Sequence, residues 1–307
     1  SLGFDKENDL WLGLDNGIAH VEVNSPISFF YDNSGILGSV YAVATINKGY
    51  LIASNHGIFE YSSGKFNMMP NTQGQGWNIS LIDGKYIIGH NDGTFSYENN
   101  ALKKINGVSG GWNMSKSSIN DTYFQSTYSG ILVYDNPADL SQYKIIKDLA
   151  KPIKYVAQNK KNEIWAADNY RGLYRVLLDD NYNTLKVENV TQQSKIQNDF
   201  GIKIFEFRKE ILFLINNTWY TYNSISNKLE ENALFNASFK NVTDVVSIDE
   251  DHFMVLQNDI LYHIYAEGNK FVWNIIQEKY YKGKLINENL RIFKKDNYYL
   301  FNLDDGF

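Results

Sequence analysis

The residues of this chain most suited to contacting a ligand stand at recurring turns. His56 and His90 occupy turn positions in neighbouring repeats. Two imidazoles hold a metal ion only if a third ligand, such as Asp92 or Asp15, converges on them with suitable geometry. The alternative is that both histidines are exposed turn residues without a role. We therefore expect no metal and no cofactor, and we keep these turns as candidate ligand contacts.

Two tryptophans supply flat apolar surfaces close to these turns. Trp77 and Trp112 each follow a glycine and open two successive inner segments of the repeat. Aromatic rings at equivalent positions of adjacent repeats can stack on a sugar or on another flat ligand. Packing between the repeats is the other explanation. Trp11 and Trp165 stand inside strand-like segments, where packing is the expected role.

The segment 169–171 replaces a turn that is shorter in the other copies. It places Arg171 beside Tyr170, and such a pair suits contact with an anion or with hydroxyl groups. A solvated loop is the alternative. The candidate ligand contacts are therefore Asn55, His56, Trp77, His90, Asn91, Trp112, Tyr128, Tyr170 and Arg171.

Motifs that carry catalysis are lacking. The sequence contains no Gly-x-Ser-x-Gly elbow, no His-Glu-x-x-His and no glycine-rich phosphate loop. The pairs Asp179-Asp180 and Asp304-Asp305 lie in turns, where Asp is favoured because its carboxylate bonds to the local backbone. The absence of cysteine excludes a thiolate site and a disulfide. We predict that the chain is not an enzyme.

Charge and hydropathy exclude two further classes. The net charge of -6 comes without a basic stripe, so we expect no direct nucleic-acid contact. No run of 18 apolar residues is present, and nothing in the chain is expected to span a membrane. Residues 1–4 carry no signal peptide. We expect the chain to be a piece of a longer protein.

A repeated strand–turn–strand unit must position the candidate residues. Leu10 to Val21 shows the pattern, with apolar residues on both sides of Asp15-Asn16-Gly17. A β-rich repeat of roughly 40–50 residues is typical of a propeller with four strands per blade. The turn position recurs at Gly17, Gly57, Gly93, Gly130, Gly172, Thr218, Asp259 and Gly306.

We therefore predict an all-β fold, a single β-propeller over residues 1–307. Seven four-stranded blades are favoured over eight, because the first copy lacks an inner strand and the last lacks outer strands. Closure of the ring would pair C-terminal strands with N-terminal ones. The turns at 15–17, 55–57, 91–93, 128–130 and 169–172 should emerge on one face, beside the segments that lead into the inner strands.

The repeat resembles the two-component regulator propeller repeat, most clearly in Asn8 to Ile18 and in Asn162 to Tyr174. Segments such as Gly89 to Thr94 and Tyr298 to Phe307 resemble the second propeller of Bacteroidetes regulators. In those proteins a triple-tyrosine domain, a membrane helix and a LuxR-type helix-turn-helix follow, and hybrid sensor kinases share the repeats. The resemblance implies a periplasmic location, neighbouring propeller and triple-tyrosine domains, and a homodimer as one option for the full-length protein.

Two functional classes follow from these observations, with a third behind them. The favoured one is a non-catalytic sensor propeller that recognises an oligosaccharide or another polar small ligand and signals to an output domain. The alternative is a metal-dependent, lyase-like propeller enzyme in which His56 and His90 would serve. The third is a constitutive scaffold for protein contacts. The residues alone do not identify the ligand, because fold does not imply function.

Overall fold

The computed structural model describes residues 1–286 and 289–307, and antiparallel strands dominate it. Its contacts divide the chain into two compact units, Ser1–Tyr31 and Asp32–Phe307. No helix in the described ranges has the length and apolar character needed to cross a bilayer.

The first unit is a three-stranded sheet of β1 (Leu2–Phe4), β2 (Leu10–Leu14) and β3 (Gly17–Val21). The predicted hairpin is confirmed, because Leu14 pairs with Gly17 across the Asp15-Asn16 turn. Gly17 has a φ of +116°, a conformation that costs glycine little because it has no Cβ.

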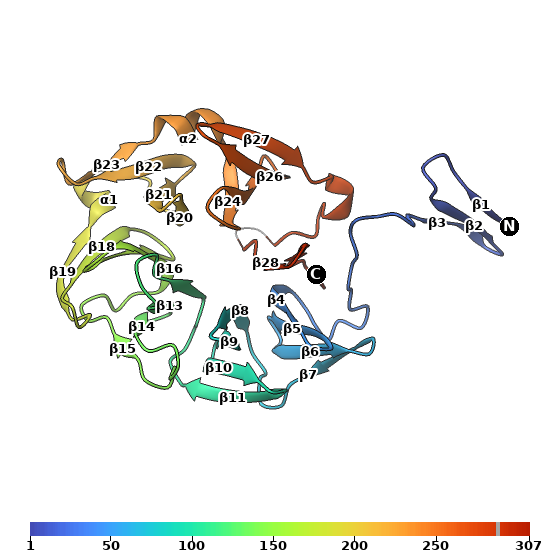
Figure 1. Cartoon of the computed structure of the whole chain (residues 1–307), viewed down its shortest axis with the longest axis horizontal. Coiled ribbons are helices and arrows are strands. Elements are labelled where there is room, and N and C mark those ends of the chain that lie inside the picture. Colours follow the sequence, from blue (N-terminus) through green and yellow to red (C-terminus); the bar gives the residue numbers. More distant parts are fainter. Residues whose placement is uncertain (287–288) are drawn as a thin grey trace. The chain divides into compact units, whose positions relative to one another are not determined.

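The second unit contains seven sheets arranged in a ring (Figure 1). Six of them are four-stranded antiparallel sheets in which neighbouring strands are consecutive in sequence, and the seventh has two strands. The predicted seven-bladed propeller is therefore confirmed, although the last blade has two strands instead of four in the described part of the chain.

The blades follow the chain order of the repeat. The first is β4 (Val40–Ile46), β5 (Gly49–Ser54), β6 (Ile58–Ser62) and β7 (Lys65–Met68). The second is β8 (Gly76–Ile82), β9 (Lys85–His90), β10 (Gly93–Glu98) and β11 (Ala101–Asn106). The third is β12 (Asn113–Lys116), β13 (Tyr123–Thr127), β14 (Gly130–Tyr134) and β15 (Lys144–Ile145). The fourth is β16 (Ile153–Lys160), β17 (Glu163–Asp168), β18 (Leu173–Leu178) and β19 (Thr184–Asn189).

The last three blades continue in chain order. The fifth is β20 (Lys203–Phe207), β21 (Glu210–Ile215), β22 (Thr218–Asn223) and β23 (Lys228–Glu231). The sixth is β24 (Val242–Ser247), β25 (His252–Gln257), β26 (Ile260–Glu267) and β27 (Lys270–Ile275), and the seventh is β28 (Ile292–Lys295) and β29 (Tyr298–Phe301). Short helices α1 (Val190–Gln193), α2 (Ala233–Ser238) and η1 (Glu278–Tyr280) follow outer strands.

The apolar core lies between the blades. Each buried cluster combines residues of two successive blades; one of them packs Phe124 and Val133 of the third blade against Ile164 and Val176 of the fourth. Trp165 is buried between the fourth and fifth blades, which confirms its predicted packing role. Burying such side chains stabilises a fold by about 1.5–3 kcal/mol each, so the blade interfaces hold the ring together.

The ring closes differently from the sequence prediction. β28 and β29 pair with each other, and no N-terminal strand adds to their sheet among the described residues. Instead, the C-terminal turn bonds to the start of the first blade, with Val40 N–H donating to Leu303 O at 3.2 Å. The buried Asn302 amide donates to Val40 O at 3.2 Å. Backbone and side-chain bonds therefore replace the predicted strand pairing.

Candidate ligand pocket

One hydrogen bond, repeated in successive blades, fixes the turns beside the inner strands. The N–H of the first turn residue donates to a carbonyl just before the inner strand of the same blade. These bonds run from Asn55 to Ser39 (3.0 Å), Asn91 to Gln75 (2.9 Å), Tyr128 to Ser109 (3.4 Å), Asn169 to Pro152 (2.8 Å), Asn216 to Phe200 (3.2 Å) and Asn258 to Asn241 (3.3 Å). The predicted shared rim is confirmed for these turns of the second unit.

In several blades a β-bulge near the start of the inner strand leaves one residue of that strand without a partner residue on the second strand. In the first blade Val40 pairs with Ser54 and Ala42 with Ala53, so Tyr41 has no partner residue. The same register shift leaves Trp77 unpaired in the second blade, Lys154 in the fourth and Thr243 in the sixth. A bulge re-aims the side chain of the extra residue.

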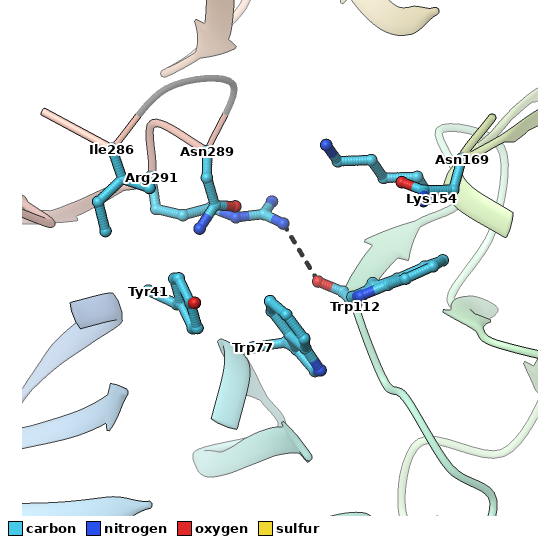
Figure 2. Close-up of a pocket in the computed structure, with 8 residues that line it drawn as sticks. All are labelled: Tyr41, Trp77, Trp112, Lys154, Asn169, Ile286, Asn289 and Arg291. Carbon is cyan, nitrogen blue, oxygen red and sulfur yellow. Dashed lines mark hydrogen bonds between the residues drawn. The ribbon is translucent and has the colours of Figure 1, made fainter. Parts of the chain in front are cut away.

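The bulge residues of three blades meet around a pocket of about 310 Å³ (Figure 2). The remaining lining comes from the segment that leads into the third blade, from the turn of the fourth blade and from the segment that leads into the seventh. The described lining residues are Tyr41, Trp77, Trp112, Lys154, Asn169, Ile286, Asn289 and Arg291. The structure thus brings the two predicted tryptophans into one pocket.

Three aromatic rings form one wall of this pocket. Tyr41 stacks on Trp77 with ring centroids 4.8 Å apart and an interplanar angle of 18°. Trp77 meets Trp112 edge-on at 6.4 Å. Each of the three side chains is half-buried, so part of each ring remains open to the pocket.

Two of the candidate contacts hold Trp77 in place from behind. Its indole Nε1–H lies 3.0 Å from Asn91 Oδ1 and 2.9 Å from the Tyr128 hydroxyl. The Tyr128 hydroxyl donates to Asn91 Oδ1 at 2.5 Å, and its ring packs edge-on against Trp112 at 4.7 Å. Burial raises the pKa of Tyr128, so this hydroxyl stays protonated at neutral pH. Asn91 and Tyr128 therefore position the aromatic wall and do not line the pocket.

Arg291 brings a positive charge to the opposite wall, across the ring from the third blade. Its guanidinium donates to Trp112 O at 3.1 Å, as drawn in Figure 2, and to Asn113 Oδ1 at 3.2 Å. Both acceptors are neutral. The Nε of Arg291 and the amide nitrogen of Asn289 are buried and have no hydrogen-bond partner.

His90 is not among the residues that line the pocket, although the sequence made it a candidate ligand contact. The side chain is fully buried, Nδ1 accepts the Asp92 N–H at 3.0 Å, and Nε2 contacts Thr72 O at 3.2 Å. The Ser54, Thr127 and Asp168 side chains accept the same turn N–H in other blades. His90 is thus a turn-capping residue whose acceptor happens to be an imidazole. Burial lowers its pKa, which favours the neutral form that this bond requires.

His56 and Asn55 stand at the equivalent turn of the first blade without reaching the pocket lining. His56 is exposed, and its Nδ1 lies 2.9 Å from Ile36 O. Asn55 is half-buried, and its side-chain oxygen has no partner. No described carboxylate joins His56 and His90 in a cluster of metal-ligand type.

The turn of the fourth blade contributes Asn169 instead of the two residues that the sequence singled out. Tyr170 is 69% exposed and is not among the lining residues. Arg171 pairs with Asp199 at 2.7 Å and donates to Gln197 O at 2.8 Å. Arg171 thus ties its turn to the loop before the fifth blade.

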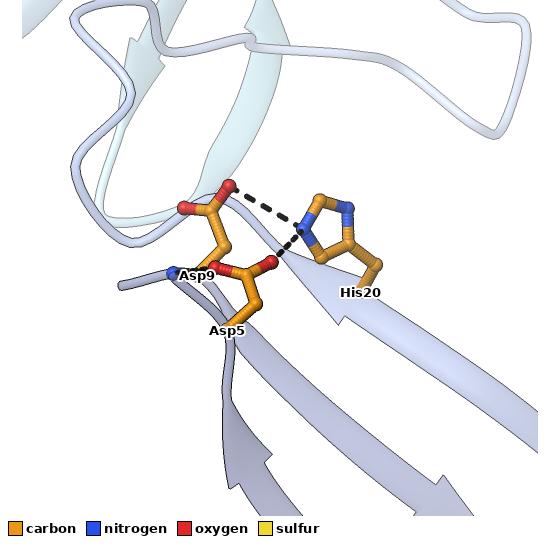
Figure 3. Close-up of side chains that lie close together, drawn as sticks. All are labelled: Asp5, Asp9 and His20. Carbon is orange, nitrogen blue, oxygen red and sulfur yellow. Dashed lines mark hydrogen bonds and ion pairs between the residues drawn. The ribbon is translucent and has the colours of Figure 1, made fainter. Parts of the chain in front are cut away.

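A second cluster of polar side chains lies in the first unit (Figure 3). His20 Nε2 is 3.4 Å from Asp9 Oδ2 and 3.9 Å from Asp5 Oδ2. The ligand types suit a metal, but Asp5 already accepts the Trp11 indole N–H at 2.8 Å and the Glu7 and Asp9 N–H groups. The His20 ring also stacks on Trp11 at 4.3 Å. We assign this cluster to the stabilisation of the hairpin.

Six of the lining residues were missed by the sequence interpretation: Tyr41, Lys154, Asn169, Ile286, Asn289 and Arg291. One signal could have found two of them. Tyr41 and Lys154 occupy the same repeat position as Trp77, two residues after the carbonyl that accepts the turn N–H. Arg291 offers no such signal, because its partner Trp112 is 179 residues away.

Comparison with known proteins supports the fold and leaves the activity open. No family model matches the sequence, and no curated protein matches it. The extracellular domain of BT4673, a presumed one-component system of B. thetaiotaomicron, matches with a TM-score of 0.62 and 16% identity over 91% of this chain and 39% of that one. The extracellular domain of BT3049, a presumed hybrid two-component system of the same organism, matches with a TM-score of 0.50 and 14% identity over 97% of this chain and 48% of that one.

A structure of YCF48 bound to D1 peptide has a TM-score of 0.58 and 11% identity, over 92% of this chain and 94% of that one. The chain spans less than half the length of the two Bacteroides structures. At these identities the similarity shows the propeller fold, which this chain shares with extracellular domains of Bacteroides signalling systems.

Proposed function

We propose that this chain is a non-catalytic ligand-recognition propeller of a larger membrane-bound regulator. The ligand would be an oligosaccharide fragment or another polar small molecule. It would enter the pocket lined by Tyr41, Trp77, Trp112 and Arg291, which we call the axial pocket. Output would come from a helix-turn-helix or a histidine kinase elsewhere in the full-length protein, with the propeller in the periplasm. Neighbouring propeller and triple-tyrosine domains would receive the signal.

One observation carries this proposal: aromatic, amide and cationic side chains from separate blades meet around one pocket. Tyr41, Trp77 and Trp112 offer surfaces on which the apolar face of a sugar ring stacks, while Asn169 and Asn289 offer hydrogen-bonding groups. Ligand pockets combine apolar lining with a few convergent polar groups in this way. The similarity in fold to extracellular domains of Bacteroides signalling systems also supports a role in sensing.

A thermal-shift screen against oligosaccharides tests this proposal. A ligand that binds only the folded state raises the melting temperature, by mass action. We expect at least one compound to stabilise the wild type and to lose its effect in the Trp77→Ala/Trp112→Ala variant. Tyr170→Ala is the matched control, because it removes an exposed aromatic at a neighbouring turn.

Two results would contradict the proposal. One is a stabilising ligand that acts equally on the wild type and on the tryptophan variant, provided that variant gives a cooperative transition. The other is a screen in which no polar compound shifts the wild type. If the double variant does not fold, the single variants Trp77→Phe and Trp112→Phe take its place in the test, because they keep most of the packing.

A further inference from the structure

We propose that the axial pocket selects an acidic sugar, one that carries a carboxylate or a sulfate, over its neutral counterpart. This inference rests on the proposed function and adds the charge of the ligand to it. The lining holds two cationic side chains, Lys154 and Arg291, and no carboxylate among its described residues. Such a pocket is unexpected in a chain of net charge -6.

Among the described residues, the guanidinium of Arg291 bonds only to neutral groups. Its two described acceptors are the Trp112 carbonyl and the Asn113 amide oxygen, and no ion pair involves it in the described ranges. A guanidinium has five N–H donors, so donors remain after these two bonds. Its planar fork binds carboxylate and sulfate-like groups through paired hydrogen bonds, which are stronger than neutral ones.

Three carboxylates of the described residues lie on segments that contact or adjoin the lining, and each already has a partner. Asp168 pairs with Lys151 at 3.7 Å and caps the Tyr170 N–H at 2.8 Å. Asp244 pairs with Lys203 at 3.0 Å and accepts the Leu290 N–H at 2.8 Å. Asp304 accepts a hydrogen bond from the Ser39 hydroxyl. None of the three is in a described ion pair with Arg291.

The aromatic wall of the pocket suits the sugar ring of such a ligand. Tyr41, Trp77 and Trp112 present ring faces and edges, and a pyranose has an apolar face that stacks on them. The volume of about 310 Å³ lies at the lower end of the range for small-ligand pockets, which favours one or two sugar units over a long chain. The acid group would meet Arg291 while the ring meets the tryptophans.

Calorimetric titration with matched sugars tests the selection. The panel pairs galacturonic and glucuronic acids, as monosaccharides and disaccharides, with galactose, glucose and their disaccharides, and adds sulfated galactose. We expect an acidic member to bind at least tenfold more tightly than its neutral partner and to weaken as salt rises. The uronate and sulfate arms separate the two sources of negative charge.

Variants tie the preference to this pocket. Arg291→Gln should remove the preference for the acid, and Arg291→Lys should keep part of it, with both checked for folding by melting temperature. Arg208→Gln is the control, since Arg208 pairs with Asp251 and does not line the pocket. Equal binding of acidic and neutral sugars, or a preference that survives Arg291→Gln, overturns the inference and leaves the proposed function standing. A panel in which nothing binds contradicts both.

Discussion

At the scale of single residues, His90 lies in the turn where the sequence predicted it, but its side chain caps the turn inside the protein. The sequence placed it in a turn, and the structure confirms the turn but buries the ring. Other blades use Ser54, Thr127 or Asp168 to accept the same N–H, so the position needs an acceptor and tolerates several. Comparison of the copies at this position could have predicted capping, whereas burial depends on the neighbouring strand and not on the turn.

The capping role makes stability depend on pH. The folded pKa of His90 lies below its ordinary value of 6.5, so the unfolded chain binds the proton first as the pH falls. The free energy of unfolding should therefore decrease as the pH drops below about 6.5, and level off once the folded pKa is passed. Burial also lowers the pKa of His263, which adds to the effect in the same direction.

Urea denaturation between pH 5 and pH 8 measures this dependence. His90→Asn retains a side-chain acceptor without a titrating group and should flatten the curve. The control His56→Asn changes an exposed histidine at the equivalent turn and keeps the bond between His90 and the Asp92 N–H. A slope unchanged in His90→Asn would contradict the assigned role.

The Tyr128 hydroxyl is the second residue-scale prediction. It contacts both the Trp77 indole and Asn91, so Tyr128→Phe removes both bonds and leaves the ring. We expect a loss of about 1–2 kcal/mol in the free energy of unfolding and weaker ligand binding. Tyr170→Phe removes an exposed hydroxyl and should change neither. Equal stabilities of the two variants in urea titrations would show that this bond network contributes nothing.

At the scale of elements, strand order was predictable and strand register was not. The predicted turn position, from Gly57 to Asp259, follows the second strand in each of the first six blades. The bulges at Tyr41, Trp77 and Lys154 were not predicted, because hydrophobic alternation does not reveal one extra residue in one strand. Helices α1 and α2 were not predicted either, because segments of 4 and 6 residues are too short to show helical periodicity.

A close approach of two glycines sets the spacing between the second and third blades. A Cβ on Gly89 would lie 1.8 Å from the Gly111 carbonyl oxygen, next to Trp112. Gly89→Ala should therefore cost about 2 kcal/mol or more, as an overpacked interior does. Gly107→Ala is the control, because no atom lies within 4 Å of its added Cβ. Similar chemical denaturation midpoints for the two variants would contradict the assigned close approach.

At the scale of the whole molecule, the sequence predicted the number of blades better than the site. Spacing of the turns identified the seven-bladed propeller, whereas the pocket joins side chains from separate blades and from the segment before β28. Trp77 and Trp112 were found because they belong to adjacent copies. Arg291 was not, because only closure of the ring brings it to Trp112.

Asn302 makes that closure testable. It is 1% exposed, donates to Val40 O at 3.2 Å and to Asn289 O at 2.8 Å, and accepts the Arg291 N–H at 2.6 Å. Asn302→Ala should lower the free energy of unfolding by at least about 2 kcal/mol, because buried groups lose their partners. It should also raise amide exchange in β4 and β28. A loss under about 0.5 kcal/mol, with unchanged exchange, would contradict this role.

The central claim is that the axial pocket is the recognition site, and fluorine NMR of 5-fluorotryptophan protein tests it most directly. The chain has six tryptophans, of which Trp77 and Trp112 line the pocket while Trp165 and Trp219 are buried between blades. Titration with the tightest-binding sugar should shift the Trp77 and Trp112 resonances together and saturably, and leave those of Trp165 and Trp219 in place. Saturable shifts confined to other tryptophans, with Trp77 and Trp112 unmoved, would contradict the account.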